Sequence, residues 1–213
     1  MSYTVKEIYS SIQLEGFHQG RPAIFLRFTG CNLWSGLERD RDSAICQFCD
    51  TDFVGTDGDG GGSFATAGDL AARVADIWNR AKTFDASRFV VCTGGEPLLQ
   101  LNDALLMALH VEGFEVAVET NGTREPIDQI DWLCVSPKAH APLVATCGDE
   151  LKLVYPQAGA APEQYADLQF DHFYLQPMYG KEAYRNFEAA RAYCQQDSRW
   201  QLSLQRQKVV GIA

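Results

Sequence analysis

The chain has 213 residues, of which 46% are hydrophobic and 22% are charged, a composition typical of globular proteins. This length predicts a single domain, residues 1–213, with a substantial buried core. The formal net charge of −10 argues against nucleic acid and anionic membranes as partners, because both attract basic surfaces. No apolar run reaches the roughly 18 residues that span a bilayer, and the N-terminus does not resemble a signal peptide. We therefore expect a cytoplasmic protein.

Short apolar runs along the chain have the length and composition of β-strands. We predict strands at residues 23–28, 88–92, 115–119, 131–135, 151–155, 173–176 and 200–204. Segment 55–63, GTDGDGGGS, is rich in glycine and predicts a flexible surface loop.

Other segments have helical patterns. Thr66 and Asp69 form a capping-box-like pair, which is followed by an apolar helical face made of Leu70, Val74, Ile77, Trp78 and Ala81. Further helices are predicted near residues 102–110 and at 181–196, the latter with Tyr184 and Phe187 as its apolar stripe.

The early part of the chain alternates strand and helix, which predicts a mostly parallel α/β sheet. Helices become scarce after Glu119, so some crossovers between strands must be loops. A complete eight-fold barrel needs about 250 residues. We therefore predict a partial (β/α) barrel in which some helical crossovers are shortened or missing.

Polar residues follow the C-terminal ends of the predicted strands, the edge at which parallel α/β sheets bind ligands. These segments are Gly30-Cys31-Asn32, Thr93-Gly94-Gly95-Glu96-Pro97, Thr120-Asn121-Gly122, Ser136-Pro137-Lys138, Gln176-Pro177 and residues 205–208. Turn propensity accounts for the glycines and prolines. It does not account for Glu96, Glu119, Lys138 and three cysteines at the same edge.

The chain has seven cysteines, an odd number that does not suggest a disulfide framework. Four of them are predicted to be inert. Cys92, Cys134 and Cys194 lie in apolar strand or helix patterns, where cysteine behaves as a small hydrophobic residue, and Cys147 lies in a loop without neighbouring ligands.

The other three cysteines have the spacing of metal ligands. Cys46 and Cys49 form a C-x2-C pair, and 14 residues separate Cys46 from Cys31. A [4Fe–4S] cluster held by three thiolates keeps one iron open for another ligand. Structural zinc would need a fourth ligand, and His18 is the only nearby histidine. A thioredoxin-like redox pair would leave Cys31 without a role. The spacing alone leaves these three interpretations open.

Together with the turn at residues 94–97, GGEP, these cysteines resemble the radical S-adenosylmethionine superfamily. There the open iron chelates S-adenosylmethionine, and one electron from the cluster cleaves this cofactor to a radical that abstracts hydrogen. The resemblance implies that Cys31, Cys46 and Cys49 bind the cluster. It also implies a set of residues that bind S-adenosylmethionine: Phe48, Cys49, Asp50, Gly94, Gly95, Glu96, Ser136, Pro137, Lys138 and Gln176.

Segments along nearly the whole chain resemble the 7-carboxy-7-deazaguanine synthase family. They are KEIYSSIQLEG, GRPAIFLRFTGCNLW, FCDTDFVGT, VVCTGGEPLLQ, VETNGT, DWLCVSPKA, ELKLVY and QKVVGIA. That family contracts the ring of 6-carboxy-5,6,7,8-tetrahydropterin to 7-carboxy-7-deazaguanine, with loss of ammonia, on the route to queuosine.

This resemblance implies Thr51 as a ligand of Mg²⁺ and a set of substrate-binding residues. The substrate residues are Ile12, Gln13, Leu14, Glu15, Arg27, Thr93, Glu119, Asn121 and the C-terminal Ala213. Arg27 offers a bidentate clamp for the pterin carboxylate, and Glu119 and Asn121 can read the aminopyrimidinone edge.

The chain departs from the family pattern at three places. The superfamily loop is normally C-x3-C-x2-C, so residues 32–45 form an insertion in the cluster loop, which we predict to be short-helical. Leu14 replaces a glycine, and Gln207 replaces a histidine. Some family members carry the same enlarged cysteine loop.

The resemblance further implies an electron donor such as a flavodoxin or ferredoxin, and a homodimer. Two alternatives stay open on the sequence. A glycyl-radical-enzyme activase would use the same radical chemistry on a large protein partner. A non-enzymatic electron-transfer or zinc-binding module would explain the cysteines but not the polar strand ends.

Overall fold

We describe the protein from a computed structural model, in which residues 2–81, 86–206 and 208 are placed. Its centre is one nine-stranded sheet in the order β3-β1-β2-β4-β5-β6-β7-β8-β9. The strands are β1 (Tyr3–Ile12), β2 (Pro22–Phe28), β3 (Gly62–Phe64), β4 (Phe89–Gly94), β5 (Glu115–Thr120), β6 (Trp132–Val135), β7 (Cys147–Tyr155), β8 (Gln169–Pro177) and β9 (Trp200–Leu202). The pairs from β2 to β9 are parallel, whereas β1 pairs antiparallel with β2 and with β3.

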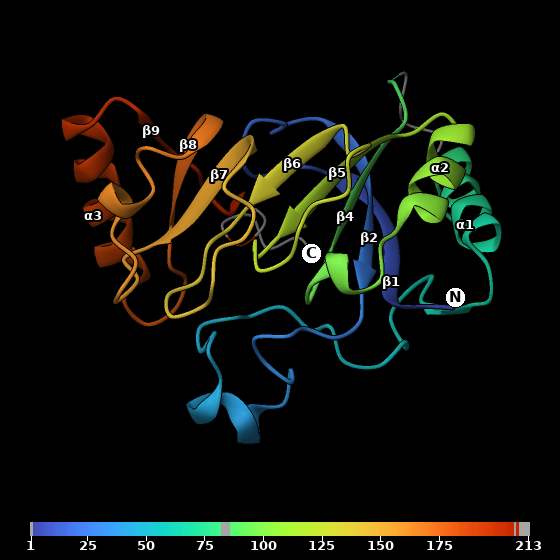
Figure 1. Ribbon diagram of the computed structural model, residues 1–213, viewed down its shortest axis with the longest axis horizontal. Coiled ribbons are helices and arrows are strands. Elements are labelled where there is room, and N and C mark those ends of the chain that lie inside the picture. The colour runs from blue at the N-terminus through green and yellow to red at the C-terminus, as the bar shows by residue number, and fades with distance from the viewer. Residues whose placement is uncertain (1, 82–85, 207, 209–213) are drawn as a thin grey trace.

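Helices connect only some of the strands (Figure 1). They are α1 (Ala67–Arg80), α2 (Asp103–Val111) and α3 (Ala183–Gln196), with short 3-10 helices η1 (Glu38–Ser43), η2 (Pro97–Leu99) and η3 (Pro162–Gln164). Among the described residues, β5, β6 and β7 follow one another through loops. The sheet formed by the described strands does not close, so the predicted partial barrel with missing crossovers is confirmed. None of the helices in the placed parts of the chain is long and apolar enough to cross a membrane.

The start of each of the first two helices follows from a capping residue. The Thr66 hydroxyl accepts the backbone N–H of Asp69 at 3.1 Å, as the capping pair predicts. The Asn102 side chain accepts the backbone N–H of Leu105 at 3.1 Å at the start of α2. Both caps satisfy N–H groups that the first turn of a helix leaves without a partner.

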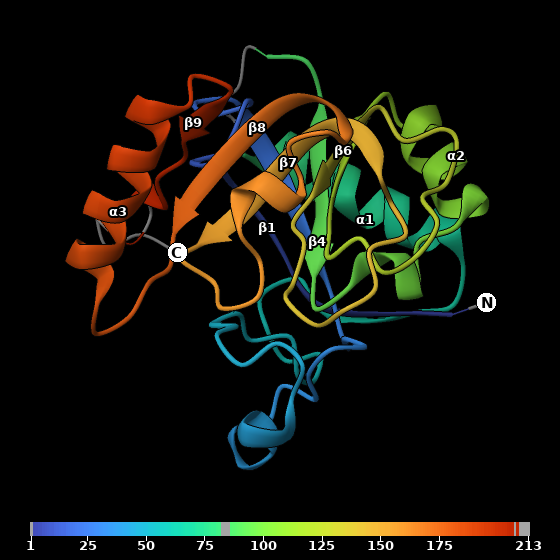
Figure 2. The same ribbon diagram turned by 60° about the vertical axis from the view of Figure 1, so that its left-hand side comes forward.

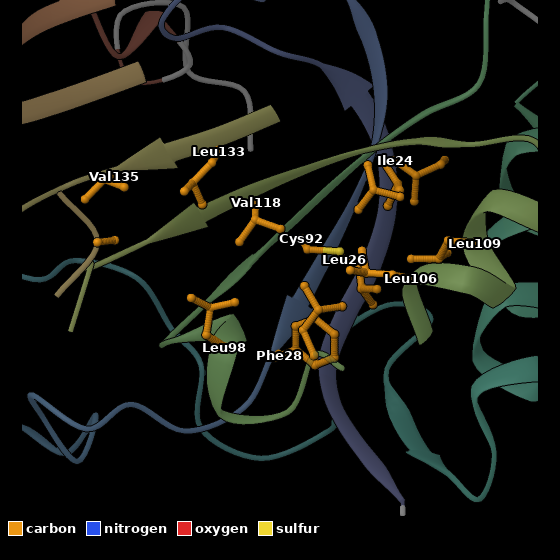
Figure 3. Close-up of a cluster of buried hydrophobic side chains, with 14 of the residues drawn as sticks. Ile24, Leu26, Phe28, Cys92, Leu98, Leu106, Leu109, Val118, Leu133 and Val135 are labelled. Carbon is orange, nitrogen blue, oxygen red and sulfur yellow. The ribbon is translucent and has the colours of Figure 1, made fainter. Parts of the chain in front are cut away.

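One face of the sheet packs against the helices and forms the main core. Figure 3 shows Leu106 and Leu109 of α2 directed toward the side of β2 that carries Ile24, Leu26 and Phe28, and all five side chains are fully buried. Burial of a side chain of this size contributes about 1.5–3 kcal/mol. This face therefore holds the sheet and the helices together.

The other face of the sheet, which we call the inner face, carries polar side chains, because successive residues of a strand point to opposite sides. Arg27 alternates with Leu26 and Phe28 in β2, and Lys152 alternates with Leu151 and Leu153 in β7. Toward the N-terminal ends of the strands this face is filled by aromatic rings. Phe17 stacks on Trp132 at 4.7 Å and on His172 at 4.4 Å. The polar residues of the inner face thus gather at the C-terminal ends.

The long connection that contains Cys46 and Cys49 lies beyond the C-terminal ends of the parallel strands. Figure 2 shows the arrowheads of β4, β7 and β8 directed toward the side on which this connection, in light blue, is placed. The predicted short helix in residues 32–45 is present as η1, Glu38–Ser43. The position of this connection brings the cysteines to the edge of the sheet where the polar residues lie.

The strand β1 was not predicted, because a bulge hides its pattern. The pairing with β2 shifts register between Val5 and Glu7, and Lys6 is buried. Buried apolar residues therefore recur at Val5 and Ile8, three positions apart instead of two. A β-bulge has this effect on strand periodicity.

Three further expectations were wrong in detail. The loop predicted at residues 55–63 ends in β3, and a Cβ atom at Gly61 would lie 2.1 Å from the Lys6 carbonyl oxygen, so the segment packs on β1. Tyr184 is 79% exposed, because α3 buries Asn186 and Ala190 on its other side. Cys147 begins β7 instead of lying in a loop.

Candidate active site

A cavity of about 460 Å³ lies on the inner face of the sheet, at the C-terminal ends of its parallel strands. This volume is within the usual range of small-molecule sites, about 300–1,000 Å³. The predicted site residues on its wall are Ile12, Gln13, Leu14, Glu15, Arg27, Cys31, Cys46, Phe48, Cys49, Asp50, Thr51, Thr93, Gly94, Gly95, Glu119, Asn121, Ser136, Lys138 and Gln176. Glu96 and Pro137 are not on this wall, and Ala213 and Gln207 lie outside the described residues.

Charges of both signs line the cavity in equal number. Its five acidic residues are Glu7, Glu15, Asp50, Asp52 and Glu119. Its five basic residues are Lys6, Arg27, Lys138, Lys152 and Lys208. Such a wall suits ligands that carry both an amine and a carboxylate.

The three predicted cluster ligands lie on the same cavity wall. Burial raises the pKa of the Cys31 thiol and of the Cys46 thiol, and Cys49 raises both further. Among the described residues no three His, Cys, Asp or Glu side chains lie close enough to hold a single metal ion. Each cysteine ligand of a [4Fe–4S] cluster binds a different iron, so three nearby thiols in one cavity fit that group.

The two glycines of the turn after β4 are required by their contact with the end of β2. A Cβ atom at Gly94 would lie 2.3 Å from the Phe28 carbonyl oxygen, and one at Gly95 would lie 2.0 Å from that of Gly30. The N–H of Glu96 donates to the Gly30 carbonyl oxygen at 2.9 Å. The turn is therefore locked to the residue before Cys31, which positions the first cysteine.

The Glu96 side chain serves the protein interior instead of the cavity. It is fully buried and accepts the backbone N–H of Leu98 at 3.0 Å, the Thr120 hydroxyl at 2.8 Å and the backbone N–H of Asn121 at 2.8 Å. Burial raises the pKa of this carboxyl group, and the three hydrogen bonds oppose that shift. The carboxylate is therefore not exposed on the cavity wall.

Polar groups in the segment after β6 and at the end of β8 line the cavity. The Lys138 ammonium donates to the Ser136 carbonyl oxygen at 2.5 Å and to its hydroxyl at 2.7 Å. Burial lowers the pKa of Lys138. The Oε1 atom of Gln176 is buried and has no hydrogen-bond partner among the placed residues. An unpaired buried acceptor on a cavity wall is suited to a ligand donor.

Arg27 is held by two side chains of β1. Its Nε atom donates to Glu7 Oε1 at 2.7 Å, and its Nη2 atom donates to the Tyr9 hydroxyl at 3.2 Å. Nη1 makes no hydrogen bond to the described residues, so the outer edge of the guanidinium is available for a carboxylate.

Glu119 lies at the centre of a polar network. Its Oε1 atom accepts from Lys152 at 3.2 Å and from Gln13 Nε2 at 3.4 Å, and its Oε2 atom accepts from the Thr93 hydroxyl at 3.1 Å. Lys152 also donates to Glu15 Oε2 at 2.9 Å. The network joins residues from four separate segments of the chain.

Asn121 connects the cysteine loop to the turn after β5. Its amide nitrogen donates to Asn32 Oδ1 at 3.0 Å, and its amide oxygen accepts the backbone N–H of Thr123 at 3.0 Å. On the other side of the loop, Lys208 forms an ion pair with Asp50. Both contacts restrain the segment that carries the three cysteines.

Sequence reasoning missed several polar residues of this cavity, notably Lys152, Glu7 and Tyr9. For Lys152 a signal was available. It interrupts the apolar segment Leu151–Tyr155 at a position that alternates with Leu151 and Leu153, and a charge there must face a polar interior. Glu7 and Tyr9 belong to β1, the strand that was not predicted.

No protein-family model matches this chain. It is 56% identical over 212 residues to the 7-carboxy-7-deazaguanine synthase of Caulobacter vibrioides and to that of Bordetella pertussis, with 100% of this chain and of each relative covered. The crystal structure of QueE from Escherichia coli has a TM-score of 0.70 and 27% identity, covering 96% of this chain and 94% of that one. The chain therefore belongs to the 7-carboxy-7-deazaguanine synthase family, whose members are radical S-adenosylmethionine enzymes with a [4Fe–4S] cluster.

Proposed function

We propose that this chain converts 6-carboxy-5,6,7,8-tetrahydropterin to 7-carboxy-7-deazaguanine with loss of ammonia, and that the reaction takes place in the 460 Å³ cavity. The observation that carries the proposal is the composition of this cavity. It combines three cysteines with a carboxylate network and an arginine, so that one space offers ligands for a cluster and partners for a small polar ring. This chemistry is a carbon–nitrogen lyase reaction of the queuosine pathway.

The cofactor side of the cavity is formed by the cysteine loop and the ends of β4, β6 and β8. Cys31, Cys46 and Cys49 hold the cluster. Residues that follow the strands hold S-adenosylmethionine: Phe48, Asp50, Gly94, Gly95, Ser136, Lys138 and Gln176. The unpaired Gln176 Oε1 and the backbone of residues 94–95 support this assignment. Glu96 and Pro137 support these residues by holding the loops that carry them. Glu96 accepts the backbone N–H of Asn121, and the Pro137 carbonyl oxygen accepts from Gln157.

The substrate side is formed by β2, β5 and the connection between β1 and β2. Arg27 binds the pterin carboxylate, since its Nη1 edge is available. Gln13, Glu15, Thr93 and Glu119 bind the aminopyrimidinone edge, whose N–H groups need acceptors. Asn121 also binds this edge, and Ile12 and Leu14 enclose the ring.

The residues of this chain orient the substrate and exclude water from it. When bound, the cluster and S-adenosylmethionine supply the radical chemistry that starts the reaction. Arg27 and Glu119 lie on strands of one rigid sheet, so the pterin that they hold keeps a fixed orientation toward the cysteine loop.

Thr51 is the proposed ligand of Mg²⁺, and it lies on the cavity wall two residues after Cys49. Mg²⁺ keeps several waters and takes oxygen atoms of its substrate, so one hydroxyl ligand from the protein is sufficient. Ala213, which lies outside the described residues, stays a proposed substrate-binding residue. A Thr51→Ala variant is expected to need a higher Mg²⁺ concentration for half-maximal activity.

Membership of the family supports three of four further proposals. A flavodoxin or ferredoxin supplies the electron, the protein forms a homodimer, and it acts in the cytoplasm. The sheet supports the fourth, a single domain over residues 1–213 with an insertion at about 32–45, because strands from both ends of the chain belong to it.

The test is anaerobic turnover. Protein reconstituted with iron and sulfide is incubated with 6-carboxy-5,6,7,8-tetrahydropterin, S-adenosylmethionine, Mg²⁺ and a reductant, and 7-carboxy-7-deazaguanine is measured by mass. Product is expected from the wild type and not from Cys49→Ala, whereas Cys147→Ala, on an exposed cysteine outside the cavity, should match the wild type. Release of 5′-deoxyadenosine without the deazapurine would contradict the proposal.

A further inference from the structure

Lys152 is a buried cation with two carboxylate partners on the wall of the cavity. Its side chain is only 8% exposed, and its Nζ atom lies 2.9 Å from Glu15 Oε2 and 3.2 Å from Glu119 Oε1. These three residues come from β7, from the connection between β1 and β2, and from β5. One ammonium group therefore joins three segments that are far apart in the sequence.

The path of the Lys152 side chain depends on β6, the strand that lies between Lys152 and Glu119. On the inner face Cys134 of β6 pairs with Glu119 of β5, and Lys152 of β7 lies on the far side of β6. Cys134 is small and buried, so the lysine side chain can extend across β6 to Glu119. Lys152 is thereby fixed in a direction that serves the substrate side of the cavity.

Glu15 and Glu119 carry like charges on both sides of the same ammonium. Two carboxylates that converge without a cation share a proton, because both cannot stay ionised close together. Burial acts to lower the pKa of Lys152, but Glu119 and Glu15 outweigh it and hold the pKa well above its usual value. The Lys152 ammonium thus stays charged over the whole physiological range. Other ionisable groups that interact with members of the triad are Tyr9, Cys134, Glu150, Lys138 and Lys208.

The hydrogen bonds of Glu119 show how much capacity is left for a ligand. A carboxylate has about four acceptor positions. Lys152, Gln13 and Thr93 occupy three of them, which leaves one position on Oε2 for a substrate N–H. Lys152 itself makes two hydrogen bonds to the described residues, both to the carboxylates.

We propose that Lys152 is a positioning residue for the substrate, because its ammonium keeps Glu15 and Glu119 ionised and side by side as acceptors for the N–H groups of the pterin. This inference rests on the proposed function and adds to it a residue that does not itself have to touch the ring. The connection that carries Glu15 is also held by β7 at a second point, where the backbone N–H of Phe17 donates to Glu150 Oε2 at 3.2 Å. Lys152, in contrast, contacts the Glu15 carboxylate directly.

The test measures binding without turnover. The Kd of 6-carboxy-5,6,7,8-tetrahydropterin is measured by calorimetry, with reconstituted protein and S-adenosylmethionine but no reductant, at pH 6, 7 and 8. For Lys152→Met we expect a Kd about 10-fold or more above that of the wild type at pH 7, which corresponds to about 1.4 kcal/mol. The ratio of the variant Kd to the wild-type Kd should fall as the pH rises. At higher pH the two carboxylates of the variant lose their shared proton and can again accept the N–H groups of the pterin.

Two further variants separate positioning from a general structural effect. Lys152→Arg restores the cation, so the ratio of its Kd to the wild-type Kd should be constant over this pH range. The double variant Lys152→Met/Glu15→Gln has one carboxylate and no proton to share, so it should bind weakly with a constant ratio, and it serves as the test if Lys152→Met does not fold. Arg21→Met removes a more exposed ion pair with Glu115, at 2.6 Å and outside the cavity, and should leave the Kd unchanged.

Two results would overturn the inference. A Lys152→Met variant that binds within 3-fold of the wild type, or whose Kd ratio is constant from pH 6 to 8, would show that the ammonium does not set the state of the carboxylates. A wild-type protein that does not bind the pterin would overturn the proposed function together with this inference. The wild-type measurement therefore distinguishes the two failures.

Discussion

The Glu96 carboxylate accepts the backbone N–H of Asn121 at 2.8 Å, and this hydrogen bond ties the turn after β4 to the turn after β5. Both turns border the cavity, and the first is also joined to Gly30 at the start of the cysteine loop. A buried acidic residue thus connects the segments on which the cofactor side of the site is built.

Replacing Glu96 by glutamine should destabilise the protein. Three N–H or O–H groups donate to the two oxygens of the Glu96 carboxylate, and the NH2 group of a glutamine would face at least one of them without forming a hydrogen bond. Hydrogen bonds to a charged group contribute about 1.5–3 kcal/mol each. We expect a loss of about 2 kcal/mol, or a fall in Tm of roughly 4–8 °C. Thermal unfolding of Glu96→Gln, with Glu125→Gln at an exposed position as control, measures this. Equal Tm values for the two variants would contradict the account of Glu96.

Adding a methyl group at Gly95 should separate the turn from the cysteine loop. The new Cβ atom would lie 2.0 Å from the Gly30 carbonyl oxygen, a backbone atom that moves only together with Cys31. Overpacking of this kind costs about 1–3 kcal/mol. We therefore expect Gly95→Ala to lower both the Tm and the iron bound per chain after reconstitution.

Gly68→Ala is the matched control for Gly95→Ala. A Cβ atom at Gly68, in the first turn of α1, meets no atom closer than 3.9 Å. Alanine is also the better helix former by about 0.5–1 kcal/mol. The control should keep the iron content and raise the Tm, and an iron content reduced equally in both variants would count against the close contact as the cause.

Lysine at position 27 should weaken substrate binding while the charge is retained. The guanidinium holds Glu7 and Tyr9 through one edge and leaves another for the pterin carboxylate, whereas an ammonium cannot serve both in a fixed geometry. We expect the KM for the pterin to rise about 10-fold in Arg27→Lys, which corresponds to one lost charge-assisted bond. Arg88→Lys, outside the cavity, should leave the KM unchanged; a normal KM in Arg27→Lys would remove the clamp from the account.

His18 should make the protein less stable in mildly acidic solution. Burial lowers its pKa, with a further contribution from Arg21, and the ring packs against Trp132 at 4.4 Å and Phe89 at 4.9 Å. In the unfolded chain a histidine takes up a proton below about pH 6.5. Since the folded state resists this proton, the free energy of unfolding falls as the pH drops from about 6.5 toward the lowered pKa.

The measurement compares the Tm at pH 7.5 and at pH 5.5 for the wild type and His18→Phe. The wild type has all the titrating groups of the variant and His18 in addition, so its Tm should fall further between the two pH values. An identical fall in both proteins would show that His18 is protonated as easily in the folded state as in the unfolded chain.

The sequence was sufficient to locate the candidate site but not to assign its contacts. The strands β2, β4, β5, β6 and β9 were predicted within two residues of their observed bounds, whereas β7 and β8 begin four residues before their predicted starts. The polar residues at the ends of these strands meet in one cavity because parallel strands end at the same edge. The bulge between Val5 and Glu7 concealed β1, and with it the residues that hold Arg27.

The role of a side chain that serves other protein groups could not be predicted from residue type. Glu96 was expected to bind a ligand ammonium, and its three hydrogen bonds within the chain depend on where the turns after β4 and β5 meet. Lys152 lies far in the sequence from both Glu15 and Glu119, so no local pattern links them. Contacts of this kind follow from the tertiary fold alone.

The most direct test of the central claim is the stoichiometry of an anaerobic turnover. Ring contraction with loss of ammonia releases one ammonia for each deazapurine formed, and both can be measured in the same sample. We predict a ratio of one, with both products absent when S-adenosylmethionine is left out. Cleavage of S-adenosylmethionine without ammonia or deazapurine, from protein that carries its full cluster, would contradict the account.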